Sequence, residues 1–262
     1  MATAFQGAIF DVDGVLVDTP HERAWRDTLR ELMESDWAGI REQTTWSPEA
    51  FTPQVYQALV SGKPRMSGAR AALEHFGGPD VAERTIEYAD RKQNMVVRLI
   101  EAGEFTAYAD ALRFIIAMKD AGLGVAAASS SKNAGLFLRT IRLDTFASEQ
   151  GISSASVGEG CTLLDIFDAD VSGRDFEHGK PHPEMFLTAA AELGVAPAAA
   201  MVLEDATAGV QAAKAGDMAA IGIARFDDAA LLEAAGADIV VVTLDEVDLG
   251  ALAEGKLVRR AS

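Results

Sequence analysis

The amino-acid sequence predicts an α/β protein whose doubly wound parallel sheet is interrupted by an α-helical insert. Short apolar runs alternate with segments of helical periodicity, which is the order produced when right-handed helical crossovers connect parallel strands. The stretch from residue 21 to about residue 105 departs from this order, because it is rich in charge and helix formers and contains no convincing strand. We therefore expect a sheet-containing core domain of residues 1–19 and 106–262 and a helical cap domain of residues 20–105.

Six apolar runs are the expected strands of the sheet, since a strand buried on both faces is apolar throughout and ends in polar residues or glycine. These runs span residues 8–10, 124–128, 169–171, 201–203, 219–223 and 239–242, of which 169–171 is the weakest. The helices expected between them span residues 109–121, 133–141, 183–193, 207–215 and 228–235, and two further helices, 23–34 and 80–100, belong to the insert. Ligands of such a sheet bind beyond the carboxyl ends of its strands, which is where site residues are expected.

Composition narrows the class of protein and its surroundings. The chain has 23 Lys and Arg against 40 Asp and Glu, a formal net charge of −17, which argues against a surface that binds nucleic acid or anionic membranes. The single cysteine, Cys161, excludes an intramolecular disulfide and fits a reducing compartment. The sequence shows no signal-peptide pattern and no run near the roughly 20 apolar residues of a membrane span. We expect a cytoplasmic protein with neither a nucleic-acid nor a membrane partner; its oligomeric state is not fixed by the sequence, and a monomer is the simplest expectation.

Two carboxylates follow the first expected strand. Asp11 and Asp13 lie two residues apart, so they leave an extended chain on the same side, and Gly14 then allows a sharp turn. Acids this close repel each other unless a cation or a proton lies between them, and a divalent metal with oxygen ligands, such as Mg²⁺, would supply that cation. A turn or helix cap built from Asp and Gly is the alternative interpretation of this segment by itself.

Polar residues that could bind phosphate follow the second and third expected strands. The segment from Ser129 through Ser131, Lys132 and Asn133 leads directly into a helix, and its hydroxyls, free backbone N–H groups and lysine form an anion site suited to phosphate. A serine N-cap would explain one of these hydroxyls but not the cluster. Lys180 stands in a Gly-Lys-Pro turn that starts another helix. Taken alone, it would be a solvated surface lysine.

A second pair of carboxylates, Glu204 and Asp205, follows the next strand along the chain, where it could also cap the following helix. Two aspartates, a serine cluster, a lysine and an acidic pair thus occur in this order at successive strand ends. This pattern resembles the haloacid dehalogenase superfamily of phosphoryl-transfer enzymes over essentially the whole chain. The resemblance implies a Rossmann-like core with an inserted helical cap domain.

The same resemblance implies a chemistry for these residues. Asp11 would attack phosphorus and form an aspartyl phosphate, while Asp13 would act as the general acid and base. Ser129 would bind the transferring phosphate, and Lys180 would stabilise its charge. The implied ligands of a Mg²⁺ ion are Asp11, the backbone carbonyl of Asp13, Asp205 and, close by or through water, Glu204.

The resemblance narrows to the β-phosphoglucomutase-like members, which carry a helical cap in the same place, with local agreement at residues 18–25, 62–65, 91–94 and 129–133. The substrate-binding residues that it implies are Arg65 with Ser131, Lys132 and Asn133 for a distal phosphate, Lys92 near the core site, and His21 near the acid/base and the sugar. Arginine suits a distal phosphate because its planar fork binds phosphate bidentately. The implied reaction converts β-glucose 1-phosphate to glucose 6-phosphate through β-glucose 1,6-bisphosphate.

Three other functions stay open. A phosphatase of the same family, hydrolysing a small sugar or polyol phosphate, would share the core residues, so only the cap residues separate it from a mutase. The second is a catalytically idle phosphosugar-binding protein, which is disfavoured because such a protein would be expected to lose Asp11 or Asp13. The third is a dehalogenase, which is disfavoured because dehalogenases of this fold lack an aspartate at the position of Asp13. The sequence also departs from the family pattern: it is two residues shorter after Thr19, has an extra Gly- and Ser-rich segment at 148–162, and has Ala206 where a hydroxyl is frequent.

Overall fold

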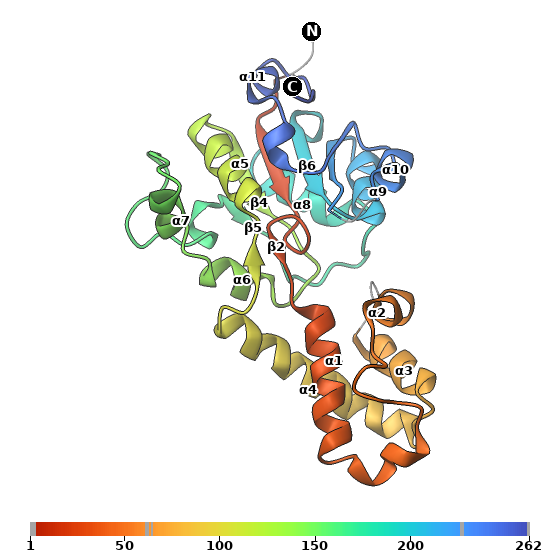
Figure 1. Cartoon of the computed structure of the whole chain (residues 1–262). Coiled ribbons are helices and arrows are strands. Elements are labelled where there is room, and N and C mark those ends of the chain that lie inside the picture. Colours follow the sequence, from red (N-terminus) through yellow and green to blue (C-terminus); the bar gives the residue numbers. More distant parts are fainter. Residues whose placement is uncertain (1–3, 61–62, 64, 226–227, 261–262) are drawn as a thin grey trace. The chain divides into compact units, whose positions relative to one another are not determined.

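The computed structural model describes residues 4–60, 63, 65–225 and 228–260, and the chain divides into two compact units. The first, here called the core unit, comprises Met1–Thr19 and Thr106–Ser262, and the second, the helical unit, comprises Pro20–Phe105 (Figure 1). Within the run 62–65, Gly62 and Pro64 lie outside the described residues. Over the described ranges, no helix combines the length and the apolar character needed to cross a membrane.

The core unit contains a six-stranded parallel sheet, which confirms the expected α/β class. Its strands, in spatial order, are β5 (Ala169–Asp170), β4 (Gly124–Ala127), β1 (Gly7–Phe10), β6 (Ala200–Glu204), β7 (Ala219–Ile223) and β8 (Ile239–Val241). β1 lies between β4 and β6, with Gly7 opposite both Gly124 and Ala200. Since the order runs outward from β1 in both directions, the carboxyl ends of β1, β4 and β6 meet at a topological switch point, where ligands of such sheets bind.

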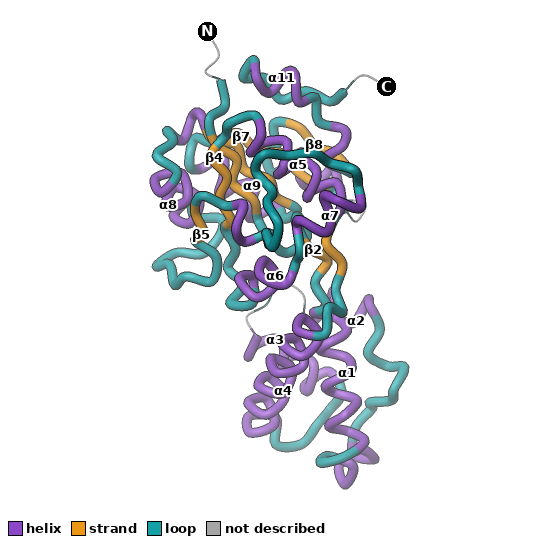
Figure 2. The backbone as a smooth tube through the Cα atoms, turned by 90° about the vertical axis from the view of Figure 1, so that its left-hand side faces the viewer, coloured by secondary structure: helices purple, strands orange, loops and turns teal. Residues whose placement is uncertain are grey.

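Helices cover both faces of this sheet because successive residues of a strand point to opposite sides. Ile9 belongs to a buried cluster with Phe186 of α8 (Glu184–Glu192) and Val210 of α9 (Thr207–Ala215). Phe10 instead packs edge-on against Phe114 of α5 (Ala109–Asp120), with 6.3 Å between the ring centroids. Figure 2 shows the strands enclosed by these helices. The apolar run of β1 therefore supplies side chains to two separate packing layers.

The core unit also has short elements that the sequence pattern did not predict. They are α7 (Leu143–Glu149), α11 (Leu249–Ala253), three 3₁₀ turns, η2 (Leu164–Ile166), η3 (Pro197–Ala199) and η4 (Leu244–Glu246), and an antiparallel pair, β2 (Val17–Asp18) with β3 (Thr106–Ala107). Elements this short carry little periodicity, so tertiary packing rather than local propensity forms them. The extra segment 148–162 begins with the last two residues of α7, and it is tied to α5 because the hydroxyls of Ser154 and Ser156 each donate to Asp120 Oδ1 at 2.8 Å. The remaining helices, α6 (Ala134–Thr140) and α10 (Ala229–Ala234), fall within expected segments.

The helical unit is built from α1 (His21–Glu34), η1 (Ala38–Gln43), α2 (Pro53–Leu59), α3 (Arg65–His75) and α4 (Val81–Glu101). Its own aromatic core contains Trp25 and Tyr88, whose ring centroids are 5.0 Å apart. Tyr88 is fully buried, and its hydroxyl donates to the backbone oxygen of Trp25 at 2.8 Å, so the polar end of the ring is satisfied. Gly68 of α3 allows close packing in this core, because a Cβ there would lie only 3.1 Å from Cγ1 of Val60, a member of the same cluster.

Candidate active site

Three carboxylates from two neighbouring strands meet at the carboxyl edge of the sheet. Asp11 directly follows β1, and its backbone N–H donates to Leu203 O of β6 at 3.0 Å. The register that pairs Phe10 with Leu203 therefore brings Asp11 beside Glu204, the last residue of β6, and Asp205. One side-chain oxygen of each of these residues, here called the acidic cluster (Asp11, Glu204 and Asp205), lies within 4.8 Å of the others. Oxygen ligands at this spacing form the donor set that hard divalent cations prefer.

Lys180 joins two members of the acidic cluster from the loop between β5 and α8. Its Nζ lies 2.6 Å from Asp11 Oδ1 and also forms an ion pair with Glu204 Oε1. The other oxygen of Glu204 accepts from Ala206 N at 2.7 Å, so this carboxylate is oriented by a donor on each side. Burial opposes the charged form of Lys180, but Asp11 and Glu204 outweigh burial and hold its pKa above the usual value. The lysine is therefore a fixed positive charge inside the cluster.

The acidic cluster is short of positive charge. Burial, opposed in part by Lys180 and reinforced by Glu204 and Asp13, raises the pKa of Asp11 to about 7. Burial and the charges of Glu204 and Asp11 raise the pKa of Asp205 to about 9. One lysine thus compensates three crowded carboxylates incompletely, and a further cation or proton is favourable here. The carboxylate donors and their electrostatics fit a divalent metal.

Two glycines create the space for the carboxylates. Gly14 adopts a left-handed conformation with φ of +83°, and a Cβ at this position would overlap the carboxylate of Asp205. Gly209, in the first turn of α9, is packed in the same way against the carboxylate of Glu204. The turn at Gly14 was predicted from the sequence. Gly209 was missed, because a glycine near the start of a helix gives no sign of what lies against it.

The serine segment after β4 lies beside Asp13. Ser129 is buried, its hydroxyl donates to Asp13 Oδ2 at 3.3 Å, and it accepts from Ser131 N at 3.1 Å. The Ser131 hydroxyl in turn accepts from Asn133 N at 3.3 Å. Lys132 is held by Asp175 Oδ1 at 2.5 Å and by Gly173 O at 2.7 Å. The structure thus places Ser129 with the carboxylates and the Lys132 ammonium against the loop after β5.

The candidate residues of the helical unit lie in two places. Lys92 of α4 is 6% exposed, with its Nζ 3.4 Å from His21 Nδ1 and 4.9 Å from the centroid of the Trp25 ring. Burial and the charge of Lys92 lower the pKa of His21 to about 3, so this imidazole is neutral. Arg65, the first residue of α3, is exposed and lies 3.7 Å from Asp90 Oδ1. The helical unit therefore offers a neutral histidine, His21, beside the buried cation of Lys92, and separately the exposed guanidinium of Arg65.

Arg225 was missed by sequence reasoning. It follows β7, and its guanidinium forms an ion pair with Asp110 in which both side chains are at most 10% exposed. The same group donates to the backbone oxygens of Gly14, at 3.5 Å, and Val15, at 3.4 Å, directly after Asp13. A lone arginine after a strand carries no sequence signal. Arg225 braces the turn that follows the two aspartates.

Comparison with known proteins identifies the family of this chain. Residues 5–217 match the family of haloacid dehalogenase-like hydrolases. The β-phosphoglucomutase of Mycobacterium tuberculosis (strain CDC 1551 / Oshkosh) is 35% identical over 260 residues, covering 92% of this chain and 91% of that protein. The fructose-1-phosphate phosphatase YqaB of Escherichia coli (strain K12) is 27% identical over 227 residues, covering 85% and 98%. Among solved structures, an archaeal β-phosphoglucomutase from Pyrococcus sp. strain ST 04 has a TM-score of 0.68 at 28% identity, covering 95% of this chain and 99% of that one.

The chain therefore belongs to the haloacid dehalogenase-like hydrolase family, as the ordered residues at its strand ends indicated, and it is an enzyme. Within that family it falls in the β-phosphoglucomutase-like subfamily.

Proposed function

We propose that the chain is a Mg²⁺-dependent phosphoryl-transfer enzyme that forms an aspartyl phosphate at Asp11, and that it acts as a β-phosphoglucomutase. The observation that carries the proposal is the buried contact of Lys180 with both Asp11 and Glu204, beside Asp205. The charge of the lysine offsets the repulsion between the carboxylate of Asp11 and a phosphate, so the carboxylate can approach the phosphorus atom. The similarity to β-phosphoglucomutases over nearly the whole chain supports the choice of reaction.

The acidic cluster, together with the backbone carbonyl of Asp13, would hold the metal. When bound, Mg²⁺ would neutralise charge between carboxylate and phosphate. Glu204 is already engaged by Lys180 and by Ala206 N, so its part would be the more indirect one. Gly14 keeps the space beside Asp205 open, because any side chain there would overlap its carboxylate.

Asp11 and Asp13 would divide the transfer between them. A carboxylate oxygen of Asp11 forms a bond to phosphorus while the bond from phosphorus to the substrate oxygen breaks, and Asp13 gives that leaving oxygen its proton. Asp13 then takes a proton from the second acceptor, which attacks the aspartyl phosphate and frees Asp11. Lys180 orients the carboxylate of Asp11, and Ser129, which contacts Asp13, would bind the transferring phosphate.

A mutase must bind a second phosphate while the first reacts. We assign this distal phosphate to Arg65 with Ser131, Lys132 and Asn133. Lys132 and Arg65 are paired with exposed aspartates, and such surface pairs are weak enough for a phosphate to replace. Lys92 and His21 would meet the sugar side of the substrate. Because Nδ1 of the neutral imidazole faces the Lys92 ammonium and accepts from it, its Nε2–H can donate a hydrogen bond to a sugar hydroxyl or to the acid/base.

The alternative is a phosphatase that hydrolyses a small sugar or polyol phosphate. Similarity to the fructose-1-phosphate phosphatase of Escherichia coli favours it. The two reactions share the Asp11 chemistry and differ in whether water or a sugar hydroxyl attacks the aspartyl phosphate. In either case the substrate would be a small phosphate ester of a sugar or polyol.

A coupled assay separates the two. β-Glucose 1-phosphate and a trace of β-glucose 1,6-bisphosphate are supplied with saturating Mg²⁺, and glucose 6-phosphate and free phosphate are followed together. A mutase forms glucose 6-phosphate much faster than phosphate, whereas release of phosphate without isomerisation makes the protein a phosphatase. Asp11→Asn should abolish both products, and turnover that survives it would overturn the aspartyl-phosphate proposal.

The assignment of the distal phosphate has its own control. Arg65→Ala should raise the KM for the bisphosphate, while Arg70→Ala, which removes another exposed arginine from the same helix, should leave it unchanged. If the two variants change the KM for the bisphosphate equally, Arg65 does not bind the distal phosphate. That result would leave the proposed reaction at Asp11 unaffected. Lys92→Ala should lower mutase turnover. Unchanged turnover would show that Lys92 has no part in binding the substrate.

A further inference from the structure

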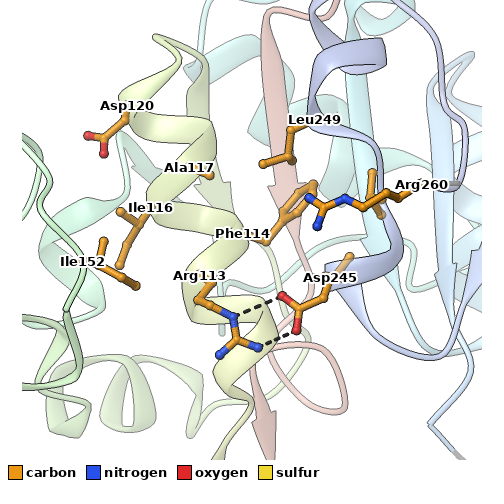
Figure 3. A pocket seen from close by; sticks show the side chains of 11 residues that line it. Arg113, Phe114, Ile116, Ala117, Asp120, Ile152, Asp245, Leu249 and Arg260 are labelled. Atoms are coloured by element: carbon orange, nitrogen blue, oxygen red, sulfur yellow. Dashed lines mark hydrogen bonds and ion pairs between the residues drawn. The ribbon is translucent and has the colours of Figure 1, made fainter. Parts of the chain in front are cut away.

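A second pocket lies in the core unit, lined by none of the residues proposed for phosphoryl transfer. It is formed by α5, η4 and the start of α11, with Ile152 from the extra segment and Arg260 from the C-terminal stretch, and has a volume of about 340 Å³ (Figure 3). Phe114, Leu249 and Ile152 give it largely apolar walls. Small-molecule sites have volumes of roughly 300–1,000 Å³, so this pocket suits a small ligand.

Most of the charged groups around this pocket are already satisfied. Arg113 donates through Nε and Nη2 to the two carboxylate oxygens of Asp245, as the dashed lines in Figure 3 show. Asp120 accepts two hydrogen bonds, from the hydroxyls of Ser154 and Ser156. The charges of Arg113 and Asp245 neutralise each other, whereas Asp120 keeps its negative charge, because both of its partners are neutral hydroxyls.

Arg260 is different, because it has no carboxylate partner among the residues that the structure describes. Its backbone is fixed, since its N–H donates to Glu246 O at 2.6 Å, and the stretch before it is held by the bond from Asp248 N to Val258 O at 3.0 Å. Arg260, Phe114 and Leu249 line the same pocket (Figure 3). Among the described residues, the pocket therefore combines apolar walls with an exposed arginine that forms no ion pair, on a chain whose net charge is −17.

We propose that this pocket binds a small organic anion with an apolar body, of the class of aromatic or medium-chain monocarboxylates. The carboxylate pairs with the Arg260 fork, which matches its geometry, and the body displaces water from the apolar walls. The acidic surface elsewhere repels anions, so binding depends on this arginine. The site is separate from the acidic cluster and is independent of the proposed phosphoryl transfer.

Calorimetric titration with 2-naphthoate tests the proposal on the whole protein, with uncharged 2-naphthamide as the matched ligand. Arg260→Gln should weaken 2-naphthoate binding at least about tenfold, which corresponds to ~1.4 kcal/mol, and should leave 2-naphthamide unchanged. Lys256→Gln is the control, because it removes a positive charge from the same stretch outside the pocket, where Lys256 pairs with Glu254. It should change neither titration. Ala117→Leu narrows the pocket and should weaken both ligands.

Three results would overturn the proposal. They are no binding of 2-naphthoate, equal loss in Arg260→Gln and Lys256→Gln, and equal weakening of 2-naphthoate and 2-naphthamide in Arg260→Gln, which would show that the positive charge is not what binds the ligand. Because the readout is binding of a probe and not turnover, failure here would leave the proposed phosphoryl transfer untouched.

Discussion

Without divalent metal, the free energy of unfolding should fall as the pH rises from 7 to 9. The pKa of Asp11 is raised to about 7 and that of Asp205 to about 9, from an ordinary value of 3.8. In this interval the unfolded chain has released both protons, while the acidic cluster of the folded chain still holds one. A folded state that binds more protons than the unfolded state is stabilised at low pH and loses that contribution as the pH passes its own pKa values.

The size of the effect follows from the number of protons. One proton held only by the folded state changes stability by about 1.4 kcal/mol per pH unit, so two units give about 2 to 3 kcal/mol as the cluster begins to titrate. The interval from 7 to 9 also avoids His21. The pKa of His21 is lowered from 6.5 to about 3, so between these values the unfolded chain holds a proton on this histidine that the folded chain lacks. The contribution of His21 to stability therefore rises with pH only up to about 6.5.

Urea unfolding at pH 7, 8 and 9, with EDTA or with excess Mg²⁺, measures this dependence. Mg²⁺ takes the place of the proton, so the fall should flatten and the stabilisation by Mg²⁺ should grow with pH. Asp205→Asn should remove most of the fall and most of the response to Mg²⁺. Asp144→Asn is the control, since Arg142 and Gly160 N hold the pKa of Asp144 low and its contribution is lost only in acid. A fall that is the same with EDTA, with Mg²⁺ and in Asp205→Asn would refute the reasoning.

Three further changes test the contacts around the cluster. Gly14→Ala and Gly160→Ala both strain a left-handed backbone, with φ of +83° and +84°, but only at Gly14 does the new methyl group overlap a carboxylate. Gly14→Ala should therefore lower the free energy of unfolding by about 1 to 3 kcal/mol more than Gly160→Ala, and it should lose Mg²⁺ affinity in a titration. Lys180→Met should cost about 3 kcal/mol in EDTA at pH 8 and be largely restored by Mg²⁺, whereas Lys214→Met, which breaks a half-exposed pair, should cost less than about 1 kcal/mol in the same unfolding experiment. Arg225→Met should cost about 3 kcal/mol, and thermal unfolding should show at best partial rescue by Arg225→Lys, because an ammonium cannot reproduce the planar fork; full rescue would contradict the bracing role.

The class of fold could be predicted because its signals are local. A strand buried on both faces is apolar over four or five residues, as in β1 and β6, and a glycine or polar residue ends it. In a parallel sheet these ends lie along one edge, so residues 11, 129, 180 and 204 could be grouped although they are far apart in the chain. The short elements α7, β2 and β3 escaped prediction, because they carry too few residues to show a period.

The sequence by itself determined which groups stand at the strand ends: carboxylates, hydroxyls and a lysine. Only the tertiary structure decided how they pair. Lys180 contacts both Asp11 and Glu204, Gly14 makes room for Asp205, and Arg225 braces the turn beside them. The physical reason is that periodicity and turn residues act over a few positions, whereas burial, pKa values and ion pairs depend on side chains brought together across the whole chain. The pocket beside Arg260 was likewise decided by the tertiary structure. Its walls come from segments more than a hundred residues apart, so no single segment of the sequence indicates it.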